Sequence, residues 1–345
     1  MKRRDFFKKS GLLASAAGLS IALGSETYAK IPMIPPIYSG KEGLPWTTEG
    51  KHWGNDPVEH FTTYYPDFAD NNIWIRKDNQ VLTTYRTGGN QKYPYFYPLI
   101  GPVSRVSVTA ESAQPWPHHR SVFLGLDKVN GGNYWQMTRD DGQILSQEIK
   151  IVGATTDRVE FTNRCIWKKP DSAPIIEDTR RYVLEWKQPE YSTLDLWYTM
   201  KMLVDVEVKK TNHGFFGVRV EQDLCPDGGG FMLSSEGGKS QKETEGLPAN
   251  WIAFYGKRRF NPAITEGVAV FCPPGQFGPF ERCPWFTRDY GNISPMPFNY
   301  VDKDYVFKFP KDSKIEKNYR TVVFAGTPAD IDLNGLWNDF YKKTK

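Results

Sequence analysis

The densest group of reactive side chains in this chain is the segment Trp116-Pro117-His118-His119-Arg120. The whole chain contains only five histidines, and two of them are neighbours here. In an extended segment adjacent side chains point to opposite faces, so we expect His118 and Arg120 to share one face while His119 occupies the other. An imidazole beside a guanidinium is suited to proton transfer next to an anion or an oxyanion. The alternatives are a turn in which backbone carbonyls bind both imidazoles, and a metal ion held by His118 or His119 with distant carboxylates.

A second cluster, residues 129–136, combines a glycine turn with amides and aromatic rings. Aromatic rings stack on the apolar faces of sugars, and amides bind hydroxyl groups, so this segment is typical of a loop that contacts a sugar. An Asn-Gly pair is also a common hairpin turn, which is the structural alternative.

The third cluster, residues 284–291, includes Arg288 and Tyr290, which share one face if the segment is extended. A nearby arginine would ease ionisation of the phenol and let Tyr290 act as acid or base. The alternative is a structural ion pair between Arg288 and Asp289 beside a core tyrosine. A further pair, Arg219 and Glu221, would share one face of a strand.

From these clusters we predict one pocket with two sets of residues. The predicted catalytic residues are His118, His119, Arg120, Arg288 and Tyr290. The predicted substrate-binding residues are Trp116, Asn130, Asn133, Tyr134, Trp135, Arg219, Glu221 and Trp285. Because the chain has no GxGxxG, P-loop, HExxH or GxSxG motif, we expect no cofactor and assign no metal ligand.

The segments that must position these residues have sequence patterns that predict β-strands. Apolar residues occupy every even position of residues 194–208, which predicts one long strand with one face in a core. Further strand-like runs follow one another with Gly and Pro turns between them. The pattern predicts an all-β fold, a large antiparallel β-sandwich of which the mutarotase-like supersandwich is one form. A short C-terminal helix is predicted to begin around Thr327 and Pro328 and to pack through Trp337 and Phe340.

The N-terminus has the features of an export signal. Arg3 and Arg4 precede an apolar run too short for a stable membrane span, and Thr27-Tyr28-Ala29 forms a small-x-small end. We therefore predict a twin-arginine signal peptide over residues 1–29, a periplasmic location and one β-sandwich domain over residues 30–345. Residues 30–70 of that domain, rich in Pro, Gly and aromatics, are expected to form an extended segment.

Composition limits the classes of partner. Residues 1–29 carry five basic and two acidic residues, so removing them lowers the formal net charge from +4 to +1. A nearly neutral chain has no field to concentrate a nucleic acid, and no later apolar stretch is long enough to span a membrane. The expected partner is a glycan or glycoside, and the sequence does not determine the oligomeric state.

The four cysteines match no zinc or redox spacing, because the chain has no CxxC. In an oxidising compartment a Cys272–Cys283 bridge is one expectation, with Cys165–Cys225 as the second. Buried thiols are the alternative.

Several of these motifs occur together in an order that resembles the PmoA-like family. The segments are Tyr95-Phe96-Tyr97-Pro98-Leu99, His118-His119-Arg120-Ser121, residues 214–220, Trp251, Trp285 and Arg288-Asp289-Tyr290-Gly291. The resemblance spans residues 85–340 and implies a β-sandwich protein of bacteria that degrade glycans, often encoded beside sugar oxidoreductases. In that family a histidine often follows the tryptophan that corresponds to Trp285, whereas this chain has Phe286. Nothing in the chain supports methane oxidation.

Three functions are compatible with these residues. The first is an exported carbohydrate-active enzyme that cleaves a glycosidic bond by elimination, as a lyase or on 3-keto-glycosides. Elimination needs a base, a group that steadies the enolate and a proton donor, for which we assign His118, Arg120 or Arg288, and Tyr290. Hydrolysis would need two facing carboxylates, and no such pair is apparent. The alternatives are a non-catalytic periplasmic glycan-binding protein and a mutarotase-like sugar epimerase.

Overall fold

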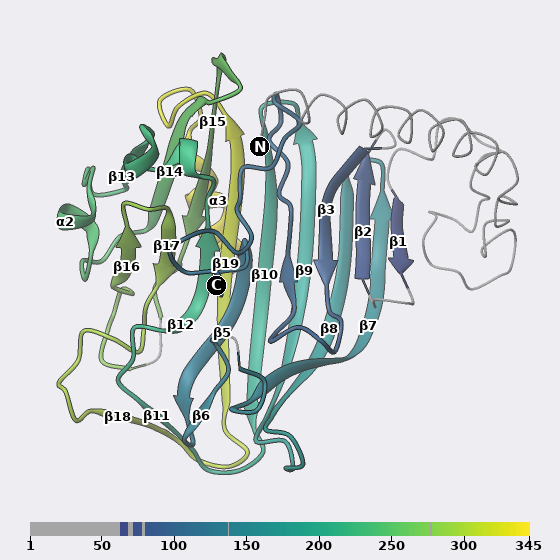
Figure 1. Cartoon of the computed structure of the whole chain (residues 1–345), viewed down its shortest axis with the longest axis vertical. Helices are drawn as coiled ribbons and strands as arrows, with labels where there is room; N and C mark the ends of the chain where they lie inside the picture. The colour runs from purple at the N-terminus through teal and green to yellow at the C-terminus, as the bar shows by residue number, and fades with distance from the viewer. Residues whose placement is uncertain (1–62, 68–71, 78–79, 137, 276–277) are drawn as a thin grey trace, which may run out of the picture. The chain divides into compact units, whose positions relative to one another are not determined.

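The computed structural model describes residues 63–67, 72–77, 80–136, 138–275 and 278–345, which form two antiparallel β-sheets and a C-terminal helix (Figure 1). The predicted class, an all-β antiparallel sandwich with a short C-terminal helix, is therefore confirmed. The predicted signal peptide and residues 30–62 lie outside the described residues. Residues 63–67, expected as part of an extended segment, form a strand that pairs with its neighbour.

The first sheet contains eleven of the described strands. Its main path runs β1-β2-β3-β4-β5-β12-β17-β16, while β6 and β11 pair with β5 and β18 pairs with β11. These strands are β1 (Thr63–Asp67), β2 (Asn72–Lys77), β3 (Gln80–Arg86), β4 (Tyr95–Phe96), β5 (Val122–Val129), β6 (Gly132–Asn133), β11 (Val206–Lys209), β12 (Gly214–Arg219), β16 (Trp285–Arg288), β17 (Asn292–Pro295) and β18 (Val306–Phe309).

The second sheet contains eight described strands in the order β13-β14-β15-β19-β10-β9-β8-β7. They are β7 (Gln143–Thr155), β8 (Arg158–Lys168), β9 (Ile176–Gln188), β10 (Tyr191–Met202), β13 (Phe231–Ser234), β14 (Trp251–Arg258), β15 (Asn261–Phe271) and β19 (Lys314–Ala325). Aromatic rings fill the space between the sheets. Tyr85 of β3 lies 5.1 Å from Tyr182 of β9, and Phe216 of β12 stacks on Tyr319 of β19 at 4.6 Å, measured between ring centroids.

The strand predicted over residues 194–208 is two strands in different sheets. β10 is central in the second sheet, between β9 and β19, and ends at Met202, whereas β11 begins at Val206 in the first sheet. At the crossing, the Asp205 carboxylate accepts from the Lys311 amide and the Asp205 carbonyl accepts from the Asn130 side chain. The alternation of apolar residues does not reveal the break between β10 and β11, because Met202 and Val206, which flank the break, are both buried.

The C-terminal helix α3 (Leu333–Lys343) begins later than predicted. Asp332 is its N-cap and accepts a hydrogen bond from the Gly335 amide at 2.8 Å. Thr327 instead closes a separate turn by donating its amide and hydroxyl to Asp330. The predicted packing holds, since Trp337 and Phe340 are buried in the core cluster of the second sheet.

The described residues also form three shorter helical segments, η2 (Gln222–Leu224), η3 (Pro226–Gly228) and α2 (Gln241–Thr244). Among the helices of the described residues, none has the length and apolar character needed to cross a membrane.

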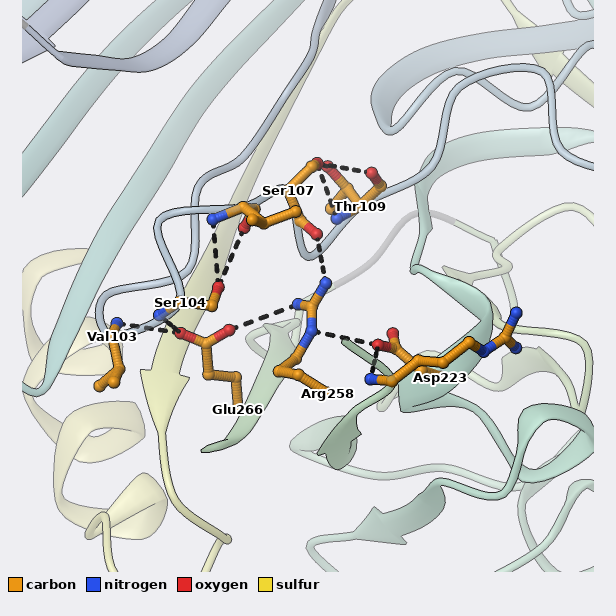
Figure 2. Close-up of polar contacts among 9 residues, drawn as sticks. Val103, Ser104, Ser107, Thr109, Asp223, Arg258 and Glu266 are labelled. Carbon is orange, nitrogen blue, oxygen red and sulfur yellow. Dashed lines mark hydrogen bonds and ion pairs between the residues drawn. The ribbon is translucent and has the colours of Figure 1, made fainter. Parts of the chain in front are cut away.

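A buried charge network fixes the loop between β4 and β5 to the second sheet (Figure 2). The Glu266 carboxylate, fully buried on β15, accepts from the amides of Val103 and Ser104 at 2.9 and 2.8 Å. Arg258 of β14 pairs with Glu266 and donates to the Ser107 carbonyl at 2.8 Å. Its Nε lies 3.2 Å from the Asp223 carboxylate. The same loop continues to His118 and His119.

The four cysteines are buried and no disulfide joins them, which corrects both predicted bridges. Cys165 lies on β8 beside Asp178, whereas the Cys225 thiol donates to the Gln222 carbonyl between η2 and η3. Cys272 and Cys283 lie close enough to hydrogen-bond to each other as thiols.

Candidate functional site

Residues of all three predicted clusters meet at a pocket of about 230 Å³. Its wall consists of Trp116, His118, His119, Trp135, Asn212, His213, Phe286, Arg288 and Tyr290. The structure thus brings His118 and His119 next to Arg288 and Tyr290 although about 170 residues separate the two motifs. Arg120 is the predicted catalytic residue that does not line this wall.

The two adjacent histidines share the pocket because their segment is a turn. The His119 amide donates to the Trp116 carbonyl at 3.1 Å, and the two imidazoles are nearly perpendicular with centroids 4.6 Å apart. The expected extended alternation is therefore wrong. Arg120 points elsewhere: its Nη1 lies 3.2 Å from Glu111 Oε1 and donates to Ser112 Oγ at 2.7 Å.

Both imidazoles are neutral at neutral pH. Burial is the largest cause, and nearby histidine and arginine charges add to it. Together they lower the pKa of His118 to about 4 and that of His119 to about 2. Burial also leaves His119 Nδ1 without a hydrogen-bond partner among the described residues. These rings can bind a ligand, but they are weak bases.

A third histidine, His213, is the one that a carboxylate holds in place. Its Nδ1 lies 3.0 Å from Asp127 Oδ2, and its ring centroid is 6.3 Å from that of His118. When Nδ1–H donates to the carboxylate, Nε2 is left as the basic nitrogen. Sequence reasoning missed this residue. The only local signal in the sequence is that His213 directly precedes a strand. Its partner Asp127, on β5, becomes a neighbour only through the pairing of Gly214 with Leu126.

Tyr290 forms the opposite part of the wall. Its ring centroid lies 4.4 Å from the guanidinium carbon of Arg219 and 6.3 Å from the centroid of His119. Burial raises the pKa of Tyr290 even though the charges of Arg219 and Arg288 lower it. The arginines ease ionisation of the phenol as expected, but burial outweighs their effect, so the phenol is protonated at neutral pH and can act as an acid.

Arg288 is held by a carboxylate that the sequence did not suggest. Its Nη1 lies 2.7 Å from Glu245 Oε2, and its guanidinium carbon is 3.6 Å from the ring centroid of Phe286. The predicted alternative partner, Asp289, instead accepts from the amide of Gln241.

In the second cluster only Trp135 reaches the pocket. Asn133 Oδ1 accepts from the amides of Trp135 and Gln136, so it orients the loop that presents the indole. Asn130 holds a turn by donating to the Asp205 carbonyl and accepting from the Glu207 amide. Tyr134 is buried against Trp167, at 5.1 Å between ring centroids.

Three further predicted substrate contacts lie away from the pocket wall. Trp285 is fully buried and donates its indole N–H to the Ala249 carbonyl at 2.9 Å, while its neighbour on β16, Phe286, faces the pocket. Arg219 lies behind Tyr290. Glu221 follows the end of β12 and directly precedes η2, and its carboxylate interacts electrostatically with Arg219.

The part of the chain that the structure describes contains no group of three or more His, Cys, Asp or Glu side chains placed to hold a metal ion. No described observation therefore supports the alternative of a metal at His118 or His119.

Fold and pocket define a two-sheet antiparallel β protein with a histidine-lined pocket. The chain belongs to DUF6807, a family of unknown function, whose family model matches residues 72–338. This assignment corrects the resemblance drawn from the motifs, since the family model that matches is DUF6807. No curated protein sequence matches the chain.

Solved structures of similar fold have low sequence identity. Galactose 1-epimerase from Lactobacillus acidophilus is 8% identical, with a TM-score of 0.41 over 77% of this chain and 99% of that protein. A putative aldose 1-epimerase from Escherichia coli is 10% identical, with a TM-score of 0.31 over 74% and 96%. A putative kojibiose phosphorylase from the human microbiome is 8% identical, with a TM-score of 0.33 over 76% of this chain and 31% of its own length. This chain therefore spans about a third of the phosphorylase, and these likenesses assign no activity.

Proposed function

We propose that this protein is a carbohydrate-active enzyme that transfers protons at the anomeric centre of a single sugar ring, as a sugar epimerase of the mutarotase type does. The observation that carries the proposal is that His213, held by Asp127, lines the same pocket as the protonated phenol of Tyr290.

Interconversion of anomers needs one base and one acid. His213 Nε2 takes the proton from the anomeric hydroxyl while the bond between C1 and the ring oxygen breaks, and Tyr290 donates its proton to that oxygen. The product is the open-chain aldehyde. Reversal of the same steps on the other face of the carbonyl closes the ring as the opposite anomer and returns both protons.

The size and wall of the pocket suit one sugar ring. Its volume of about 230 Å³ lies below the roughly 300–1,000 Å³ of pockets for drug-sized ligands. Trp116 is 47% exposed at the wall, and Trp135 is buried within it, so an indole face is available to stack on a sugar.

Elimination, which the sequence favoured, is less well supported. It needs a cation to stabilise an enolate, yet Arg120, one of the two arginines assigned to that role, pairs with Glu111 away from the pocket. Hydrolysis needs two carboxylates across the bond, and none is among the residues that line the pocket.

The proposal is tested by exchange NMR of the α and β anomers of free aldoses, including glucose and galactose, in the presence of the mature protein. We expect accelerated exchange, and His213→Gln is expected to lower kcat by about 10²–10⁴ because it removes the base. Asp127→Asn is expected to lower kcat as well, because an amide no longer enforces the basic Nε2 tautomer.

Arg282→Gln is the control, since its guanidinium pairs with Glu236 outside this pocket. Full activity of a folded His213→Gln protein would contradict the proposal. Sugar binding without exchange would favour a glycan-binding protein, and enone absorbance from 3-keto-glycosides would favour elimination.

A further inference from the structure

The residues that form the pocket wall include a permanent positive charge and no carboxylate. His118 and His119 are neutral at neutral pH, and no carboxylate is among the residues that form the wall. Two carboxylates bind residues of the wall: Asp127 binds His213 and Glu245 binds Arg288. The permanent charge on the wall itself is therefore the guanidinium of Arg288.

Arg288 uses only one side of its guanidinium. Its polar contacts, to Glu245 at 2.7 Å and to the Thr287 carbonyl at 2.8 Å, both use Nη1. Nε and Nη2 make no bond to other described residues, so this edge can receive a ligand. A guanidinium edge with two parallel N–H groups matches the two oxygens of a carboxylate.

A second cation lies directly behind the wall. Arg219 is 3% exposed, and its one hydrogen bond among the described residues runs from Nη2 to the Gln114 carbonyl at 2.7 Å. Its Nε and Nη1 have no hydrogen-bond partner there. The carboxylates of Glu221 and Asp227 act on this cation through space, and its charge acts over a short distance on the pocket that Tyr290 borders.

A buried N–H donor of the pocket wall also lacks a hydrogen-bond acceptor among the described residues. The indole N–H of Trp135 has no partner among the described residues. Buried donors in folded proteins are nearly always paired, so such an atom beside a pocket indicates where a ligand or an ordered water accepts.

We propose that the preferred ligand is a hexuronate, a sugar ring whose carboxylate lies against the free edge of Arg288 and near Arg219. The inference rests on the proposed function for the sugar ring and adds the charge of the substrate. Although the mature chain is predicted to be nearly neutral overall, the permanently charged residue among those that line the pocket is an arginine.

Isothermal titration of the mature protein with D-glucuronate and D-galacturonate tests the proposal against D-glucose and D-galactose. We expect each uronate to bind about tenfold or more tightly than its neutral counterpart, with the difference shrinking as salt is added. Arg288→Gln is expected to remove this difference between the uronates and the neutral sugars. Arg282→Gln, which removes a half-buried arginine that also pairs with a glutamate, should preserve it.

Equal or tighter binding of the neutral sugars would overturn the inference, as would a preference for glucose 6-phosphate over glucuronate. The two proposals fail separately. Tight uronate binding without anomer exchange would contradict the proposed function and support this inference. Anomer exchange of neutral aldoses with no preference for uronates would support the function and contradict the inference.

Discussion

The protonation states of single residues set the chemistry of the pocket. Burial keeps His118 and His119 neutral and Tyr290 protonated at neutral pH. His213 differs from the other two histidines because Asp127 holds one of its nitrogens. The division between weakly basic ligand-binding imidazoles and one oriented imidazole follows from burial and from a single carboxylate.

The same shifts predict how stability depends on pH. In the unfolded chain both histidines protonate near 6.5, whereas in the folded protein the pKa is about 4 for His118 and about 2 for His119. Below pH 6.5 the unfolded state binds more protons, so stability is full above pH 6.5 and falls as the pH decreases towards 4 and below.

We expect the melting temperature to decrease over this range in thermal scans at successive pH values. His118→Gln should flatten the decrease between pH 6.5 and 4. A wild-type melting temperature that rises on acidification from 6.5 to 4, or a variant with an unchanged slope, would show that the folded histidine is not neutral.

At the scale of elements, the loop from β4 to β5 depends on close contact with β15. A Cβ at Gly101 would overlap the carboxylate of Glu266, which cannot move away because it is fully buried and bonded to two loop amides and to Arg258. Gly101→Ala is therefore expected to destabilise the protein by about 2 kcal/mol or more in urea denaturation.

Gly89→Ala is the matched control, since a Cβ there has open space around it. We expect that variant to unfold within about 0.5 kcal/mol of the wild type. Equal effects of the two substitutions would mean that the loop adjusts without disturbing Glu266.

At the scale of the whole molecule, a buried ion pair on β9 links several strands of the second sheet. Asp178 accepts from Arg180 at 2.8 and 3.0 Å, from the Trp167 indole at 2.6 Å and from the Tyr198 hydroxyl at 3.3 Å. Asp178→Asn leaves the Arg180 charge buried without a counterion, so we expect a loss of about 3–5 kcal/mol.

The preceding residue, Glu177, is the control. Its pair with Arg164, at 3.1 Å, is about 40% exposed, so Glu177→Gln is expected to cost less than about 1 kcal/mol. Free energies of unfolding from urea titrations compare the two variants. A cost for Asp178→Asn no greater than that for Glu177→Gln would contradict the assigned role of the buried pair.

A further prediction at the scale of the whole molecule concerns its export. Because Arg3 and Arg4 precede a short apolar run, we predict export of the folded chain and cleavage after Ala29. Replacing both arginines by lysine is expected to leave the uncleaved precursor in the cytoplasm, as measured by cell fractionation and immunoblotting. Unchanged export of this variant would point to the general secretory route.

The amino-acid sequence by itself determined the class of fold, because the period of two in residues 194–202 is a local property of a strand with one buried face. It also indicated that His118, His119 and Tyr290 belong near one another. It did not reveal the crossing at residues 203–205, since the apolar residues on both sides face inward.

Only the tertiary structure decided which side chains form the site. The turn at Trp116 brings both neighbouring histidines to one wall, and Glu111 holds Arg120 away from it. Asp127 and His213 lie far apart in the chain and meet because β5 pairs with β12. Such contacts depend on strand pairing over long sequence separations, which local residue types and spacing do not encode.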